Sequence, residues 1–319
     1  MAKKTPLIQP DAQRAVNWNE KAVQAVIDEH GHVLCGIKVD GIRAHLFRQD
    51  GGLKIITRAG HEIPAMSGWH ERILGSWDVL GFGENVVLDC ELHIPGVDFQ
   101  KTSGLLRRNT PLPEEYTPQF VILDVYGMDH LLGNKADSPA FGHRLTSIAR
   151  KLNGKTLLDS AEIFVGEALT AAYTLDGVRG AYKDARGMGY EGVIVKDPRA
   201  EVRNGKVAGF WKLKPGCGMP GWEGDGVVIG YVWGDADKAN AGKIVGFRVR
   251  LDDGSESNAT GLTQAQMEEL TAEYNHWGIS AHMGRIARIE AMERTNGGSL
   301  RHPRFIGFRD LDSAPGDLV

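Results

Sequence analysis

The sequence contains few cysteines and no long apolar run. Its three cysteines, Cys35, Cys90 and Cys217, are widely spaced, and none of them forms a C-x-x-C pair. An odd number of scattered cysteines predicts neither a disulfide framework nor a zinc site, and favours a reducing compartment. The chain lacks the roughly 18 uncharged apolar residues that a membrane-spanning helix needs, and its first residues lack the apolar core of a signal peptide. We therefore expect a cytoplasmic protein outside the membrane.

The sequence also lacks an excess of positive charge. Its formal net charge is −4 and its isoelectric point is about 6.3, whereas nucleic-acid-binding domains are often basic overall. Basic residues nevertheless occur in small groups, which is compatible with a basic surface patch on a protein whose net charge is negative. These groups are Arg107 with Arg108, Lys212 with Lys214, Arg248 with Arg250, and Arg301 with Arg304 and Arg309.

The length and a change in composition predict two domains. A chain of 319 residues can form two cores of ordinary size. The glycine- and proline-rich stretch KPGCGMPGWEGDG is typical of a linker, so we place one domain at residues 1–215, another at 216–319, and a hinge at about 215–224. The second domain has short strands and one helix with a Thr263/Gln266 capping box, a pattern typical of a small OB-fold β-barrel.

Strand and helix patterns alternate in the first domain, which predicts an α+β fold. QDGG between two alternating segments predicts a hairpin. Ser138 followed by Pro139 predicts the start of a helix, with Ser138 as its N-cap. Residues 166–189 read as helical, with breaks at their glycines.

Several charged residues lie at the ends of apolar strands. Lys38 follows one in GIKVDGIR, and a lysine is a nucleophile only when burial or nearby cations favour loss of its proton. Side chains two residues apart on a strand share a face, so pairs in DCEL and WKLKP predict carboxylates for Mg²⁺ and a cationic floor for phosphates. Taken singly, each is more commonly an ordinary strand-end charge. The residues are Asp89, Glu91, Glu191, Lys196, Lys212 and Lys214.

The ordered set K-x-D-G-x-R, T-R-x-G, D-x-E-L, E-G-V-I-V-K and W-K-L-K-P resembles the covalent nucleotidyltransferases, which include DNA ligases, RNA ligases and mRNA capping enzymes. ELHIPGVDFQKTSGLLRRN and GSLRHPRFIGFRD look most like the small ATP-dependent DNA ligases of bacteriophages. The resemblance extends from about Val33 to Arg309. It implies an antiparallel-sheet nucleotidyltransferase domain, an ATP-grasp-like adenylation domain, followed by an OB-fold domain.

The resemblance implies a role for each matching residue. Lys38 accepts AMP from ATP with release of pyrophosphate. Asp40 orients the Lys38 side chain or helps to bind Mg²⁺ or another divalent cation. Arg301 and Arg304 close over the triphosphate, and the hinge then lets them swing away. Glu91 and Glu191 hold the metal. The residues that contact ATP or AMP are Ile37, Lys38, Arg43, Arg58, Glu91, Lys196, Lys212 and Lys214.

The resemblance further implies that the enzyme seals nicks in duplex DNA that carry a 3′-hydroxyl and a 5′-phosphate, through lysyl-AMP and a DNA-adenylate, in replication, repair and recombination. We expect a monomer, in the bacterial cytoplasm if a phage encodes it. Phosphate contacts would make DNA binding independent of sequence and sensitive to salt. The candidate DNA-binding residues, for which ordinary exposed charge is the alternative, are Arg43, Arg58, Lys101, Arg107, Arg108, Lys238, Lys243, Arg248 and Arg250.

The chain departs from the family pattern at three points. Many relatives have a glutamate two residues before the nucleophile that reads the adenine amino group, but this chain has Gly36. We expect backbone groups at residues 33–37 to select the base instead. Leu123 stands where many relatives have an aromatic residue that stacks on the base. Tyr126 and Phe120 are the candidates to stack on the base instead. Family members often end the last motif with an acidic residue followed by a lysine that helps pyrophosphate release. This chain has Asp310 and Asp312 there but no lysine.

Two other functions stay open at this stage. The same chemistry would serve an RNA ligase or a GTP-using capping enzyme, although the second domain looks like that of phage DNA ligases. Alternatively, the chain could be a non-catalytic nucleic-acid-binding protein with a decayed first domain. The intact set of Lys38, Glu91, Glu191, Lys212 and Lys214 argues against decay.

Overall fold

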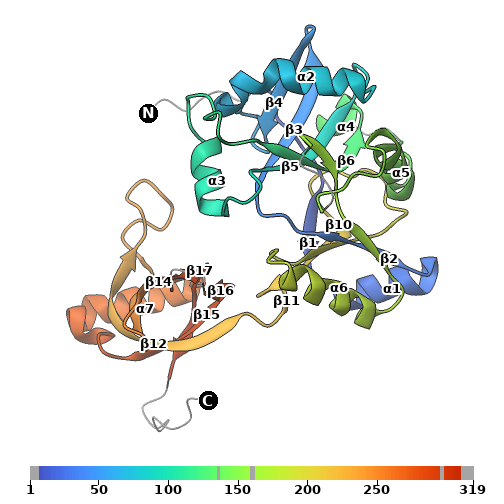
Figure 1. Cartoon of the computed structure of the whole chain (residues 1–319). Helices are drawn as coiled ribbons and strands as arrows, with labels where there is room; N and C mark the ends of the chain where they lie inside the picture. The colour runs from blue at the N-terminus through green and yellow to red at the C-terminus, as the bar shows by residue number, and fades with distance from the viewer. Residues whose placement is uncertain (1–6, 135–136, 159–161, 295–297, 310–319) are drawn as a thin grey trace. The chain divides into compact units, whose positions relative to one another are not determined.

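A computed structural model describes residues 7–134, 137–158, 162–294 and 298–309. The chain divides into two compact units, Met1–Lys214 and Pro215–Val319, which we describe separately. Both units combine strands with helices (Figure 1), so the fold class is α+β. Within the described residues, no helix is long and apolar enough to cross a membrane.

One sheet of the first unit has five strands in the order β4-β3-β5-β6-β7. Its neighbours are antiparallel except β6 and β7, which are parallel. The strands are β3 (Ile42–Gln49), β4 (Gly52–Thr57), β5 (Val87–His93), β6 (Gln119–Tyr126) and β7 (Phe164–Gly166).

The second sheet of this unit has the order β1-β10-β9-β2-β8, and β11 pairs with β10. The two helices α1 (Glu20–His30) and α6 (Leu175–Gly187) contact each other and this sheet (Figure 1). The strands are β1 (Arg14–Asn17), β2 (Val33–Ile37), β8 (Leu169–Ala172), β9 (Val193–Lys196), β10 (Lys206–Pro215) and β11 (Gly218–Met219).

The largest core of the first unit lies against the five-stranded β4-to-β7 sheet. Trp77 from α2 and Phe120 from β6 are fully buried in it, as are Leu46 and Leu92. Burial of such side chains contributes about 1.5–3 kcal/mol each. The remaining helical segments of this unit are η1 (Pro64–Trp69), α2 (His70–Val79), α3 (Phe99–Leu106), α4 (Met128–Leu131) and α5 (Phe141–Lys151).

The predicted hairpin at QDGG is confirmed. Gln49 pairs with Gly52 across the end of β3 and β4, and Asp50 and Gly51 have φ angles of 53° and 73°. Two successive residues with positive φ form the type I′ turn, whose twist matches that of the flanking strands. Local turn chemistry therefore sets the register of this hairpin.

Two element predictions were wrong in detail. Helix α5 begins at Phe141 with Ala140 as its N-cap, because the Ser138 hydroxyl instead accepts a hydrogen bond from the backbone of Val202 at 2.7 Å. Residues 166–189 are not one broken helix. Residues Leu169–Ala172 form β8, which hydrogen-bonds to β2, and only the stretch after Thr174 is helical. In both places a partner distant in the sequence overrides local propensity.

The second unit is built on a closed barrel of five strands in the order β12-β13-β14-β18-β15. Helix α7 (Gln264–Trp277) connects β14 to β15 through η2 (Gly278–Ala281), and the Thr263/Gln266 capping box is confirmed. Strands take up much of the segment expected to be a linker, since β11 lies in it and β12 starts at Trp222. The strands are β12 (Trp222–Trp233), β13 (Ile244–Leu251), β14 (Glu256–Thr260), β15 (Ile286–Ala291), β16 (Glu293–Arg294), β17 (Leu300–Arg301) and β18 (Arg304–Phe308).

A buried ion pair connects α5 to β6. Arg144 donates from Nε to Asp124 Oδ1 at 2.7 Å and from Nη2 to Asp124 Oδ2 at 2.8 Å, and it also donates to the Ala200 carbonyl at 3.1 Å. Both side chains are almost completely buried. Removing one partner of such a pair leaves the other charge without a counterion.

We predict that Arg144→Ala lowers the free energy of unfolding by about 3–5 kcal/mol, because Asp124 would stay buried and unpaired. Urea unfolding measures this difference. Arg150→Ala on the exposed side of the same helix is the control, and it should change stability by about 0.5 kcal/mol or less. Equal stability of the two variants would contradict the prediction.

Candidate active site

A cleft of ≈ 840 Å³ lies in the first unit, and both of its sheets contribute to the lining. A cleft of this size accommodates a nucleotide-sized ligand. The structure brings these residues predicted from the sequence to its wall: Ile37, Lys38, Arg43, Arg58, Asp89, Glu91, Arg107, Lys196 and Lys212.

Lys38 enters the cleft directly after β2. Its backbone N–H donates to the Gly192 carbonyl at 2.9 Å, and its ammonium group donates to Glu191 Oε2. Lys214 donates to the other oxygen of Glu191 at 2.6 Å, so that two ammonium groups share one carboxylate. Burial raises the pKa of Glu191, but the two lysines outweigh it and lower that pKa to about 2. Glu191 is therefore ionised throughout the physiological range.

Two glycines allow these strands to approach closely. A Cβ on Gly192 would lie 2.3 Å from the Leu213 carbonyl oxygen, and a Cβ on Gly41 would lie 2.5 Å from that of Leu92. Any side chain would push the backbone segments apart and move Lys214 or Glu91. Gly41 does not have a positive φ, and its role is this close contact with β5.

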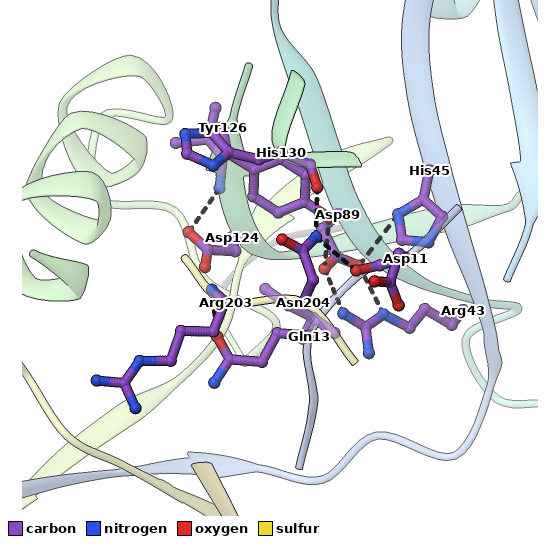
Figure 2. Close-up of polar contacts among 12 residues, drawn as sticks. Asp11, Gln13, Arg43, His45, Asp89, Asp124, Tyr126, His130, Arg203 and Asn204 are labelled. Carbon is purple, nitrogen blue, oxygen red and sulfur yellow. Dashed lines mark hydrogen bonds and ion pairs between the residues drawn. The ribbon is translucent and has the colours of Figure 1, made fainter. Parts of the chain in front are cut away.

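A buried polar network holds Arg43 (Figure 2). Arg43 Nε donates to Asp89 Oδ1 at 2.8 Å, its Nη2 donates to Oδ2, and the Tyr126 hydroxyl donates to Oδ2 at 3.1 Å. Burial by itself would raise the pKa of Asp89, but Arg43 holds it below its usual range. His45 Nδ1 lies 3.5 Å from the same carboxylate. Burial lowers the pKa of His45 to about 4, so it is neutral at pH 7.

Glu91 follows Asp89 on β5 and also lines the cleft. Burial raises the pKa of Glu91 to about 7, against the opposing effects of Lys38 and Arg43. Without a ligand, this carboxyl group is therefore close to half-protonated at neutral pH. A cation bound beside it would favour the ionised form.

Sequence reasoning missed Glu167, a buried cleft residue between β7 and β8. Lys196 donates to Glu167 Oε2 and to the Leu123 carbonyl oxygen, the latter at 3.4 Å. Burial raises the pKa of Glu167, and Lys196 opposes that effect. Glu167 carried no signal in the sequence, because its segment read as part of a helix.

Other predicted residues lie outside the described lining of the cleft. Glu191 and Lys214 connect to it through Lys38, whereas Asp40, Lys101 and Arg108 do not line it. Of the aromatic candidates, Tyr126 lines the cleft beside Leu123, and Phe120 is buried in the core.

The remaining predicted residues belong to the second unit. Arg301 Nη1 lies 3.4 Å from Glu293, and Arg304 is exposed on β18. Four cations on or near the barrel strands pair with acidic residues of the same unit: Lys238 with Asp235, Lys243 with Glu268, and both Arg248 and Arg250 with Glu256. Asp310 and Asp312 lie outside the described residues.

Comparison with known proteins identifies the class. Residues 15–214 match the family model of the ATP dependent DNA ligase domain, and residues 220–309 match that of the DNA ligase C-terminal domain. The chain belongs to the ATP-dependent DNA ligases. These enzymes seal nicks in DNA through a lysyl-AMP intermediate.

Individual relatives agree over nearly the whole chain. The DNA ligase of Enterobacteria phage T3 is 29% identical and that of Escherichia phage T7 is 28% identical, each over 95% of this chain and 96% of the relative. The solved structure of the ATP-dependent DNA ligase from bacteriophage T7 in complex with ATP is similar with a TM-score of 0.57 and 28% identity, and covers 95% of this chain and 99% of that one. The chain thus resembles small phage ligases throughout.

We predict that His45 makes the stability of the protein depend on pH between about 6.5 and 4. His45 binds a proton near pH 6.5 in the unfolded chain and only near pH 4 in the folded chain. Between these pH values the unfolded state therefore holds more protons than the folded state. Stability due to this residue is intact above pH 6.5 and falls by up to about 3 kcal/mol as the pH drops to 4.

Urea unfolding of the parent and of His45→Gln between pH 7 and 4 measures this effect. The variant should show a shallower fall in free energy of unfolding. His143→Gln on the exposed side of α5 is the control and should keep the parental slope. Parallel curves for His45→Gln and the parent would rule out the assignment.

Proposed function

We propose that the cleft of the first unit is the ATP site of this ligase and that Lys38 is the residue that accepts AMP. The observation that carries the proposal is the placement of the Lys38 amine at the wall of the cleft, on a buried carboxylate shared with a second lysine. The first unit then acts as the adenylation domain. Family membership supports the reaction, and this geometry supports the choice of lysine.

In the proposed step, Lys38 Nζ attacks the α-phosphorus of ATP. The new bond is P–N, and the bond to the bridging oxygen of pyrophosphate breaks. An ammonium has no lone pair, so Lys38 must first give up a proton to solvent water. Glu191 Oε2, which accepts its hydrogen bond, would then orient the neutral amine. Lys212 at the cleft and Lys214 beside Glu191 would stabilise the charge that develops on the phosphate oxygens.

The carboxylates present fit a magnesium ion held largely by its substrate. Among the residues that the structure describes, no three His, Cys, Asp or Glu side chains form a metal cluster. Mg²⁺ typically binds one or two carboxylates and takes its other ligands from phosphates and water. Glu91 would supply one carboxylate from the cleft wall. Glu191 would supply a second by releasing Lys38 or Lys214 from one of its oxygens. The bound ion would neutralise phosphate charge during the transfer.

We further propose that the second unit is an OB-fold domain. Five strands close a barrel in which β14 and β18 are parallel, and one helix precedes the fourth strand. The glycines near the unit boundary would provide the hinge that the family's two conformations require. Arg301 and Arg304 would then act on the triphosphate, and Asp40 on the lysine or metal.

Nicked duplex DNA is the proposed partner, engaged mainly through phosphates. Exposed Arg58, Arg107 and Arg108 would contact it from the first unit, and Arg248 and Arg250 from the barrel. Lys101, Lys238 and Lys243 are further candidates of the same kind. We propose a monomer acting in the cytoplasm of a bacterial host, because two relatives that match 95% of this chain are phage ligases.

The adduct test is direct. Purified protein mixed with α-labelled ATP and Mg²⁺ should acquire an acid-labile label and pass it on when nicked duplex is added. Lys38→Ala should lose the label completely, because no other amine occupies its position. Lys183→Ala, on the exposed face of α6, is the control and should label normally. Label retained by Lys38→Ala would show that another residue is the nucleophile.

The barrel contribution to DNA binding is tested by salt dependence. Removing one cation that binds a phosphate reduces the slope of log Kd against log salt concentration by about 0.9, so Arg248→Ala combined with Arg250→Ala should reduce it by about 2. Fluorescence anisotropy with a nicked duplex measures the slope. Lys183→Ala should keep the parental value. An unchanged slope in the double variant would exclude these arginines from the interface.

A further inference from the structure

The Glu167 carboxylate has one oxygen that nothing in the described structure uses. Its side chain is only 2% exposed. Oε2 accepts from Lys196, whereas Oε1 is buried and has no hydrogen-bond partner among the described residues. Leaving a buried polar atom unsatisfied is costly, more so when it belongs to a charged group. Because Glu167 also lines the cleft, this oxygen is a candidate for contact with a ligand.

The position of this oxygen coincides with the space that a side chain at Gly36 would need. A Cβ built on Gly36 would lie 1.8 Å from Glu167 Oε1 and 2.4 Å from its Cδ. Gly36 lies two residues before Lys38, and it pairs with Leu169 of β8 and with Ile194 of β9. Glu167, from the neighbouring connection between β7 and β8, thus places a carboxylate beside the strand that carries the nucleophile.

Apolar side chains accompany this carboxylate in the lining of the cleft. Leu123, Ile194 and Phe210 are cleft residues, and Lys196 lies over the Phe210 ring at 5.4 Å from the ring centroid. A site that combines apolar walls with one polar acceptor suits a flat heteroaromatic base with one exocyclic donor. A phosphate would be repelled by Glu167, so this part of the cleft suits the base end of a nucleotide.

We propose that Glu167 Oε1 accepts a hydrogen bond from the 6-amino group of adenine, and that Glu167 thereby selects ATP over 6-oxopurine nucleotides. This inference rests on the proposed ATP site. A 6-oxo group would place an acceptor against Glu167 Oε1. Neither the 6-oxo oxygen nor Oε1 would then have a hydrogen-bond donor. Sites built to hydrogen-bond a substrate group discriminate strongly against an analogue that lacks it, by a factor of about 10⁴ or more in favourable cases.

Lys196 is the positioning residue in this arrangement. Its ammonium group holds Oε2, and cation–π contacts with Phe141 and Phe210 at 4.8 and 5.4 Å help to fix the ammonium in turn. The carboxylate cannot rotate away from the base without breaking a buried ion pair. A purely structural Glu167 would balance the charge of Lys196 and would have no effect on the choice of base.

The test compares ATP with inosine 5′-triphosphate, which replaces the 6-amino group by an oxo group. In Glu167→Gln, the amide oxygen can still accept from Lys196, and the amide NH₂ then points where Oε1 was. We expect the parent to form the lysyl-nucleotide with ATP at a kcat/KM at least about 100-fold above that with inosine triphosphate. Glu167→Gln should reduce this preference at least tenfold or invert it, mainly through KM.

Two further variants sharpen the comparison. Glu201→Gln, an exposed carboxylate in the same unit, should retain the parental ratio. Glu167→Gly should lose the preference, and adding Gly36→Glu should restore part of it, because the new side chain enters the space that Glu167 vacates. Recovery of base choice by a carboxylate from a different strand would not follow from a merely structural role.

The outcomes separate the two levels of the proposal. A folded Glu167→Gln with a preference within twofold of the parent would overturn the role in base selection. If the parent gave no adduct with ATP, or Lys38→Ala still gave one, the proposed ATP chemistry would fail instead. Should Glu167→Gln not fold, the parent is tested with purine riboside triphosphate, which has hydrogen at C6. At least a tenfold loss relative to ATP is expected, and equal use would refute the inference.

Discussion

Charge balance inside one cleft is the constraint on which this structure depends. Four buried or partly buried cations in or beside the cleft have a carboxylate partner from a different segment: Lys38 and Lys214 share Glu191, Arg43 has Asp89, and Lys196 has Glu167. A lone charge at such depth costs several kcal/mol, and a pair recovers that cost only with good geometry. The strands that carry these residues are therefore held in register by groups that line or adjoin the cleft.

This balance also prepares the site for its chemistry. In the proposed ATP site, two ammonium groups share the Glu191 carboxylate, so the polyphosphate of ATP would meet a region in which positive charge exceeds negative charge. Donors fixed before the substrate arrives need no reorganisation when charge develops in the transition state. The missing Cβ at Gly41 lets β5 approach closely enough to hold Glu91 in place. The missing Cβ at Gly192 does the same for β10 and Lys214.

The departure of this chain from many family members at Gly36 becomes intelligible in the same terms. The glycine leaves a gap beside β2, and the Glu167 carboxylate occupies it. Membership of the ATP-dependent DNA ligases accounts for the reaction. In the proposed site the carboxylate beside Gly36 comes from a different segment, because a carboxylate can reach one point in space from more than one strand.

Local chemistry in the sequence was enough to predict the Asp50-Gly51 hairpin, the Thr263/Gln266 capping box and the strand-end position of Lys38, since each depends on residues a few positions apart. The ordered motifs also predicted several charged residues of the cleft lining, among them Lys38, Arg43 and Glu91. Only the tertiary structure decided that Ser138 does not cap α5, that Leu169–Ala172 is a strand, and that Glu167 lies against Gly36. These features depend on partners far away in the chain, and no local pattern encodes which distant backbone will supply a hydrogen bond or fill a gap.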